Sequence, residues 1–76
     1  MKEILETIVK SLVDNQEAVE IEEIEDEKSI SFKVKAAEED MGKIIGKQGK
    51  IAQSIRTIMR AVTNNRSKKV TVEFID

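Results

Sequence analysis

Hydrophobic residues near the start of the chain come in adjacent pairs that recur every four residues. The pairs are Ile4-Leu5, Ile8-Val9 and Leu12-Val13. This spacing places all six side chains on one side of a helix and leaves polar residues on the other. The pattern predicts an amphipathic helix over residues 2–14, which Asp14-Asn15 would end.

Three later segments alternate between apolar and polar residues, as half-buried strands do. Ile24 is out of phase with the first segment, so we expect that strand to end or bulge there. Residues 25–28 are the expected turn between the first two strands. The apolar positions of the three strands are, in chain order, Val19 and Ile21; Ile30, Phe32, Val34 and Ala36; and Val70, Val72 and Phe74.

Two helices are expected between the second and third strands. The first covers residues 38–45, because acidic residues favour a first helical turn and an apolar face follows them. Gly46 is expected to end this helix in a left-handed cap, and the second helix begins near Lys50. Asn64-Asn65 can stop the second helix. Its predicted apolar stripe is Ile51, Ile55, Ile58 and Val62, flanked by Ala52 and Met59. Its predicted polar side is Gln53, Arg56 and Arg60.

The predicted order of elements is αββααβ. Strands joined by a tight turn pair antiparallel, whereas strands joined by a helical crossover run parallel. We therefore expect one α+β domain over residues 1–76, with a three-stranded mixed sheet covered on one face by three helices.

Composition excludes several classes of protein. Without cysteine the chain forms no disulfide, and without histidine a zinc site is improbable. No apolar run is long enough for a membrane span or a signal peptide, so we expect a soluble, cytoplasmic protein without cofactor or metal. A domain this short has a small core, and dimerisation is one way for it to bury more surface.

The charge is divided unevenly along the chain. Residues 1–40 carry 13 acidic and 5 basic side chains, whereas residues 41–76 carry 2 acidic and 8 basic ones. This division indicates one anionic and one cationic surface. It is explained either by an unevenly charged soluble domain or by a basic half that meets a polyanion.

All three glycines lie between residues 42 and 49. In the segment Gly46-Lys47-Gln48-Gly49, glycine permits both a positive φ and a close approach by another backbone. The next helix directs its free N–H groups to the same place, where Lys43, Lys47 and Lys50 add positive charge. The arrangement suits a sugar-phosphate backbone, with Ile44, Ile45 and Ile51 as an apolar floor and at least one of them in the core. A plain helical turn with solvated lysines is the alternative.

Two kinds of active site are disfavoured. A nucleotide-binding P-loop needs the pattern G-x-x-x-x-G-K-[ST] directly after a strand. Here three residues separate Gly42 from Gly46, and Gln48 follows Lys47. Ser54 lies one turn after Lys50 and is interpreted as a solvated serine rather than a nucleophile, so no enzyme is expected. Gly42 itself indicates a close approach inside a helix, by a neighbouring strand or by a ligand.

The string from Ile44 to Ile51, IIGKQGKI, resembles the GXXG signature of KH domains, which bind nucleic acid. The αββααβ order resembles the type II, bacterial arrangement, and the likeness covers the whole chain. The resemblance implies that about four nucleotides of single-stranded RNA or DNA are held in a groove, with the loop clamping their backbone. By the same likeness Ile45 and Ile51 line the groove and Arg56 flanks it.

Stand-alone bacterial KH proteins of this kind also imply partners. They form homodimers, pair with a second KH protein, bind many cellular RNAs and are linked to cell elongation and division, as RNA chaperones or post-transcriptional regulators. This chain has no tyrosine or tryptophan, so bases cannot stack on such rings beside the loop. We expect weak, salt-dependent and loosely sequence-selective binding. The alternative is a protein-interaction module that dimerises through Ile58, Met59 and Val62.

Overall fold

The structure is a computed structural model that describes residues 2–63 and 68–75, and its elements follow the order expected from the sequence. Asn64-Asn65, the expected stop of the last helix, lie outside the described residues. Two short 3-10 turns, η1 (Gln16–Ala18) and η2 (Lys47–Gly49), join the larger elements. These are α1 (Lys2–Leu12), β1 (Glu20–Glu25), β2 (Ser29–Lys35), α2 (Glu38–Ile45), α3 (Lys50–Thr63) and β3 (Lys69–Ile75).

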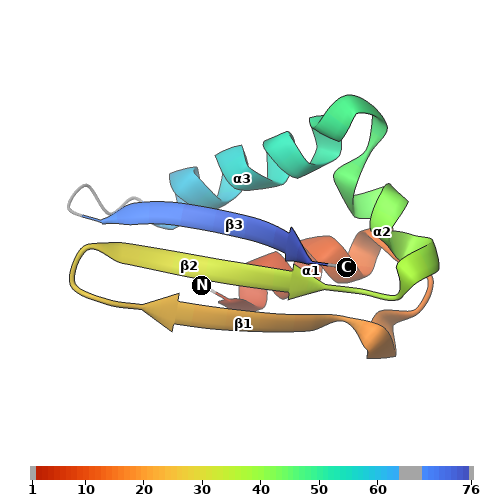
Figure 1. Cartoon of the computed structure of the whole chain (residues 1–76), viewed down its shortest axis with the longest axis horizontal. Helices are drawn as coiled ribbons and strands as arrows, with labels where there is room; N and C mark the ends of the chain where they lie inside the picture. The colour runs from red at the N-terminus through yellow and green to blue at the C-terminus, as the bar shows by residue number, and fades with distance from the viewer. Residues whose placement is uncertain (1, 64–67, 76) are drawn as a thin grey trace.

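The three strands form one mixed sheet in the order β1-β2-β3 (Figure 1). β1 pairs antiparallel with β2, and β2 pairs parallel with β3, as the connections predict. The expected end or bulge at Ile24 is wrong, because Ile24 pairs in unbroken register with Ser31. Its side chain lies on the face of the sheet that carries no helix, where 43% of it is exposed. Such a face tolerates an apolar residue out of phase.

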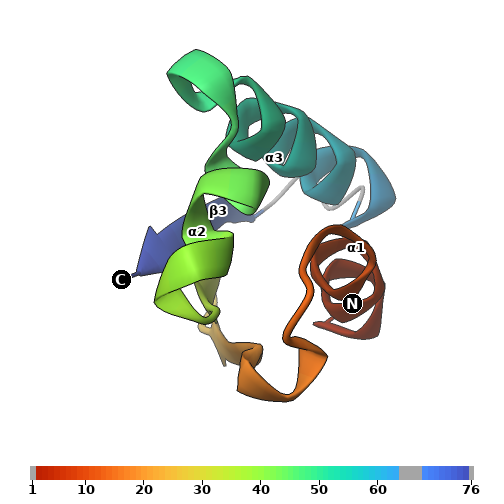
Figure 2. The ribbon, with the colours of Figure 1, turned by 90° about the vertical axis from the view of Figure 1, so that its right-hand side faces the viewer.

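The core lies between the other face of the sheet and the three helices (Figures 1 and 2). The inward residues of β2 and β3 are buried in the alternation that the sequence predicts. Phe32, at the centre of β2, is fully buried and is the largest side chain in the core. The helices contribute Leu5, Val9, Met41, Ile44, Ala52, Ile55 and Met59.

The buried stripe of α3 differs from the expected one. Ala52, Ile55 and Met59 face the core, whereas Ile51, Ile58 and Val62 are 37–42% exposed. The prediction is confirmed for Ile55 and is wrong for the other three members of the stripe, because apolar residues cover more of the helix than the sheet can bury. The exposed set, called here the apolar flank, consists of Ile51, Ile58 and Val62.

The predicted first helix is present, and it stops at Leu12, two residues before the expected end. The cause lies in α2, where the buried carboxylate of Asp40 accepts hydrogen bonds from two backbone N–H groups after the helix. The donors are Asp14, at 3.3 Å, and Asn15, at 3.0 Å. Lys43, on the same helix, pairs with Asp40 at 3.3 Å and also with Asp14. This cluster holds the end of α1 against α2.

We expect Asp40→Asn to destabilise the protein near neutral pH and to flatten its acid unfolding. The N–H of Asn15 foremost, with that of Asp14 and the ammonium of Lys43, lowers the pKa of Asp40 below its ordinary value. A carboxyl with a depressed pKa stabilises the fold above its unfolded pKa, and the stabilisation is lost as pH falls through the folded pKa. Urea unfolding at pH 7 and at about pH 3 measures this, with the exposed Glu39→Gln as control. The expectation would be contradicted if the free energy of unfolding changed equally with pH in Asp40→Asn and in the unaltered protein.

Candidate nucleic-acid interface

The glycine loop begins where α2 ends. The N–H of Gly46 donates to the Gly42 carbonyl at 2.9 Å, and Gly46 then adopts φ +78° and ψ 176°. The positive φ was expected, but the extended ψ is not that of a left-handed cap and belongs to a region that essentially only glycine adopts. A Cβ atom on Gly46 would lie 2.6 Å from Ile51 Cγ1 and 2.9 Å from the Ile51 backbone nitrogen. The loop therefore packs directly on the first turn of α3.

Two further residues with positive φ complete the turn. Gln48 has φ 59° and ψ 25°, and Gly49 has φ 74°. The N–H of Gly49 donates to the Gly46 carbonyl at 3.2 Å, and α3 starts at the next residue. Lys47 and Gln48 are exposed, so their side chains project from the tip of the turn. Figure 1 shows this corner at the end of the molecule opposite the β1–β2 turn.

The three lysines near the loop differ in their surroundings. Lys47 and Lys50 are exposed and have no ion-pair partner among residues 2–63 and 68–75. Lys43 is committed to Asp14 and Asp40, and its hydrogen bonds to them, first to Asp14, raise its pKa. Lys47 and Lys50 are thus the available cations of the loop, whereas Lys43 connects α2 to the end of α1.

Arg56 lies on the side of α3 that faces β3. Its Nε donates to the Val72 carbonyl at 3.1 Å, and its Nη1 donates to Gln53 Oε1 at 3.2 Å. Its guanidinium carbon lies 5.4 Å from the centre of the Phe74 ring, within cation–π range. Arg56 is therefore a fixed positive charge on the outer edge of β3.

The expected apolar floor is only partly present. Ile44 is fully buried and belongs to the core, as anticipated for at least one of the three isoleucines. Ile45 is half-buried and Ile51 is 37% exposed. Five helical residues correspond to a rotation of about 140°, so Ile51 and Arg56 lie on opposite sides of α3. A ligand on the β3 side meets Arg56, and one on the other side meets the apolar flank.

Sequence reasoning did not single out a shallow hollow of about 520 Å³ on the outer surface of α3. Lys50, Gln53, Ser54, Thr57 and Ile58 line it. The three-to-four-residue spacing of the polar members is the signal that would have found it. Ser54 donates its hydroxyl to the Lys50 carbonyl at 3.0 Å, so the ammonium of Lys50 does not activate it. The hollow supplies polar contacts and no catalytic pair.

In residues 2–63 and 68–75 no cluster of three or more acidic side chains could hold a metal ion. In the same ranges no helix has the length and apolar character needed to cross a membrane.

Comparison with known proteins agrees with the fold. Residues 2–74 match the family model described as KhpA/KhpB, KH domain. The chain is 53% identical over 75 residues to a protein named RNA-binding protein KhpA from Caldanaerobacter subterraneus, covering 99% of this chain and 100% of the relative. It is 52% identical to that of Clostridium acetobutylicum, with the same coverage. It is 45% identical to that of Listeria monocytogenes, with both chains covered in full.

Proposed function

The chain belongs to the KhpA/KhpB family of KH domains, and we propose that it binds single-stranded RNA at the glycine loop. The family is one of RNA-binding KH proteins and not of enzymes. Relatives that match the chain over its whole length are named RNA-binding proteins, which supports RNA as the ligand.

The conformation and exposure of the glycine loop support it as the site of RNA binding. Lys47, Gln48 and Gly49 form a tight turn at the start of α3. Gln48 and Gly49 have positive φ, and Lys47 and Gln48 are exposed. The turn brings exposed Lys47 and Gln48 next to the N–H groups that open α3, and such N–H groups attract phosphate. Lys50 adds a further positive charge. The corner therefore offers donors and charge to a nucleic-acid backbone.

The proposed contacts divide by chemistry. Gly46 and Gly49 let the RNA backbone approach, and Lys47, Gln48 and Lys50 contact its phosphates. Ile45 contacts bases or sugars, and Arg56 contacts the strand on the β3 side. Ile51 lies on the opposite side of α3, so it contacts only nucleotides that lie over the loop. Lys43 is assigned a smaller part because its ammonium is already paired with two carboxylates. About four nucleotides fit such a groove, and without aromatic stacking the affinity rests on phosphate contacts.

The test replaces the loop tip by acids. Lys47→Asp/Gln48→Asp is expected to abolish binding of labelled single-stranded RNA while changing the free energy of unfolding by no more than about 0.5 kcal/mol. Both side chains are exposed, and aspartate tolerates the left-handed conformation of Gln48. Fluorescence anisotropy at low and high salt measures binding, and urea unfolding measures stability.

The matched control is Lys2→Asp/Gln16→Asp, which makes the same two chemical replacements at exposed positions away from the loop. It should bind RNA almost as the unaltered protein does. Normal binding by the loop variant, or equal losses in variant and control, would show that the loop is not the site.

A second candidate function is a protein-interaction module. The apolar flank of α3 favours it, although Met59, expected on this surface, is fully buried and takes no part. We propose a homodimer, or a pair with a KhpB-type KH protein (also called Jag or EloR), through Ile58 and Val62. Light scattering measures the mass in solution. A dimer without salt-sensitive RNA binding would favour this function over the first.

The cellular setting is proposed from the same likeness. We place the protein in the cytoplasm, as an RNA chaperone or post-transcriptional regulator of many RNAs with a link to cell elongation and division. Crosslinking of RNA in cells, compared between the unaltered protein and the loop variant, tests the RNA-based part of this assignment.

A further inference from the structure

A second group of cations lies at the end of α3 farthest from the glycine loop. Between this end and the start of β3 is a hollow of about 340 Å³. It lies beside the β1–β2 turn, because the N–H of Lys69 donates to the Lys28 carbonyl at 2.9 Å. The hollow, called here the distal hollow, is lined by Arg60, Thr63, Lys68, Lys69 and Val70.

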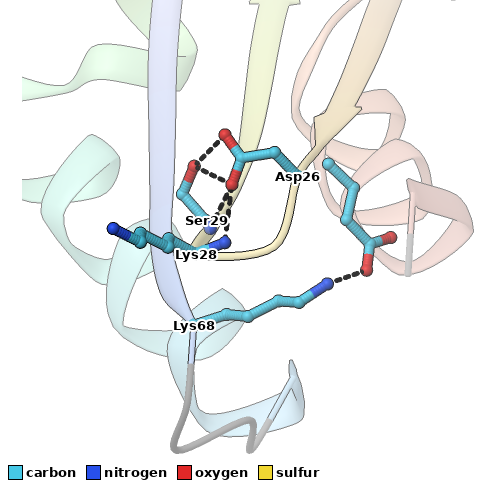
Figure 3. A network of polar contacts seen from close by, with 5 residues as sticks. Asp26, Lys28, Ser29 and Lys68 are labelled. Carbon is cyan, nitrogen blue, oxygen red and sulfur yellow. Dashed lines mark hydrogen bonds and ion pairs between the residues drawn. The ribbon is translucent and has the colours of Figure 1, made fainter.

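Lys68, which lines the distal hollow, is held by an ion pair beside the β1–β2 turn (Figure 3). The ammonium of Lys68 pairs with the Glu25 carboxylate, and only 19% of the lysine side chain is exposed. In the adjoining turn, Asp26 accepts hydrogen bonds from the N–H groups of Lys28 and Ser29, both at 2.7 Å. These bonds, that of Lys28 first, lower the pKa of Asp26. Lys68 and the turn beside it are thus held by contacts within the protein.

The remaining charge of the distal hollow is not neutralised within the described residues. Arg60 and Lys69 are exposed, and across residues 2–63 and 68–75 neither has a carboxylate partner. Glu25 pairs with Lys68 and leaves the charges of Arg60 and Lys69 without an offset among these residues. Two positive charges therefore face a concave surface, which suits an anion with several oxygens, such as a phosphate.

The seam between α3 and β3 runs from the loop end of α3 to the distal hollow. Arg56 lies on this seam, and Arg60 follows it one helical turn later on the same side. Ten helical residues from Lys50 to Arg60 span about 15 Å. A path over the other edge of the sheet is disfavoured, because β1 presents Glu20, Glu22, Glu23 and Glu25. An RNA strand that follows the seam from the loop to the distal hollow thus meets positive side chains, whereas a strand that crosses β1 meets glutamates.

We propose that the distal hollow is a second phosphate-binding site for the RNA strand held at the glycine loop. The protein then contacts a longer stretch of RNA than the groove alone. This proposal rests on the proposed function, since it needs the strand to be anchored at the loop. The second site lengthens the bound stretch of RNA and increases the salt dependence of binding. It adds no base selectivity, because the groups it offers are cations, while the Thr63 hydroxyl already donates to the Met59 carbonyl at 2.9 Å.

The experiment compares oligouridylates of four and ten nucleotides by NMR titration and anisotropy. For Arg60→Gln/Lys69→Gln we expect unchanged affinity for the tetramer, roughly tenfold weaker binding of the decamer, and a salt slope for the decamer lower by about 1.4. In the unaltered protein the decamer alone should shift the amide signals of Thr63 and Val70. The control Lys2→Gln/Lys10→Gln removes two positive charges from α1 and should change neither affinity.

The outcomes separate the two proposals. Equal decamer affinity in variant and unaltered protein, or equal losses for tetramer and decamer, would overturn the distal site while leaving the loop intact. If Lys47→Asp/Gln48→Asp leaves tetramer binding unchanged, the loop assignment falls. If the unaltered protein binds neither oligonucleotide, both proposals fall.

Discussion

Gly46→Ala is expected to lower the free energy of unfolding by on the order of 3 kcal/mol and to remove RNA binding. Two costs add. Alanine does not readily adopt φ +78° with ψ 176°, and its Cβ would lie 2.6 Å from Ile51 Cγ1. Because the backbone nitrogen of Ile51 is also only 2.9 Å away, the first turn of α3 must move. Urea unfolding and RNA anisotropy measure the two effects.

The other two glycines provide matched controls. A Cβ on Gly49 meets no atom within 4 Å, so Gly49→Ala should cost only the strain of its positive φ, about 1 kcal/mol. A Cβ on Gly42 is equally free and lies inside α2, so Gly42→Ala should stabilise the protein by about 1 kcal/mol. A cost for Gly46→Ala no larger than that for Gly49→Ala would show that the contact with Ile51 is unimportant.

Gly42→Ala also decides a question that the sequence left open. A close approach by a neighbouring strand does not explain this glycine, since no atom lies near its missing side chain. Approach by a ligand is the other explanation that the sequence offered, and this substitution tests it. We therefore expect the same substitution to weaken RNA binding while it stabilises the fold, and unchanged binding would leave the glycine without a function in recognition.

Phe32→Ala should have the largest effect on stability. Phe32 is fully buried at the centre of β2, opposite Val72 of β3. Removing a buried phenyl ring costs about 3–5 kcal/mol through lost burial and the cavity that remains. A single core in a domain this short rarely supplies more than about 3–5 kcal/mol, so a large share of the protein should unfold at 37 °C. Circular dichroism against temperature and urea measures the change.

The control for Phe32→Ala is Ile24→Ala, in the adjacent strand. Ile24 is 43% exposed on the face without helices, so its truncation should change stability by no more than about 0.5 kcal/mol. Similar losses for the two variants would mean that the face of the sheet carrying no helix is covered in solution.

Local patterns were sufficient to predict the order of elements and the pairing of strands. The alternation in β2 and β3 is regular because one face of each is buried and the other is not. The loop was predictable for a similar reason. Gly46 and Gly49 both have positive φ, and no other residue type adopts that conformation as readily.

Contacts between distant residues account for what the sequence did not predict. The end of α1 depends on Asp40, and the pairing of Lys43 depends on Asp14, each more than twenty residues away in the chain. The buried side of α3 could not be chosen from its pattern, since Ile51 and Ile58 are as apolar as Ile55. Only packing against the sheet selects among them.

Both outer strands of the sheet are protected against addition of a further strand. Glutamates follow one another along β1, and like charges would repel a second copy of that strand. On the opposite edge, Arg56 already occupies the Val72 carbonyl that an incoming strand would need. Copies of this chain should therefore not assemble into continuous sheets or fibrils, even at high protein concentration.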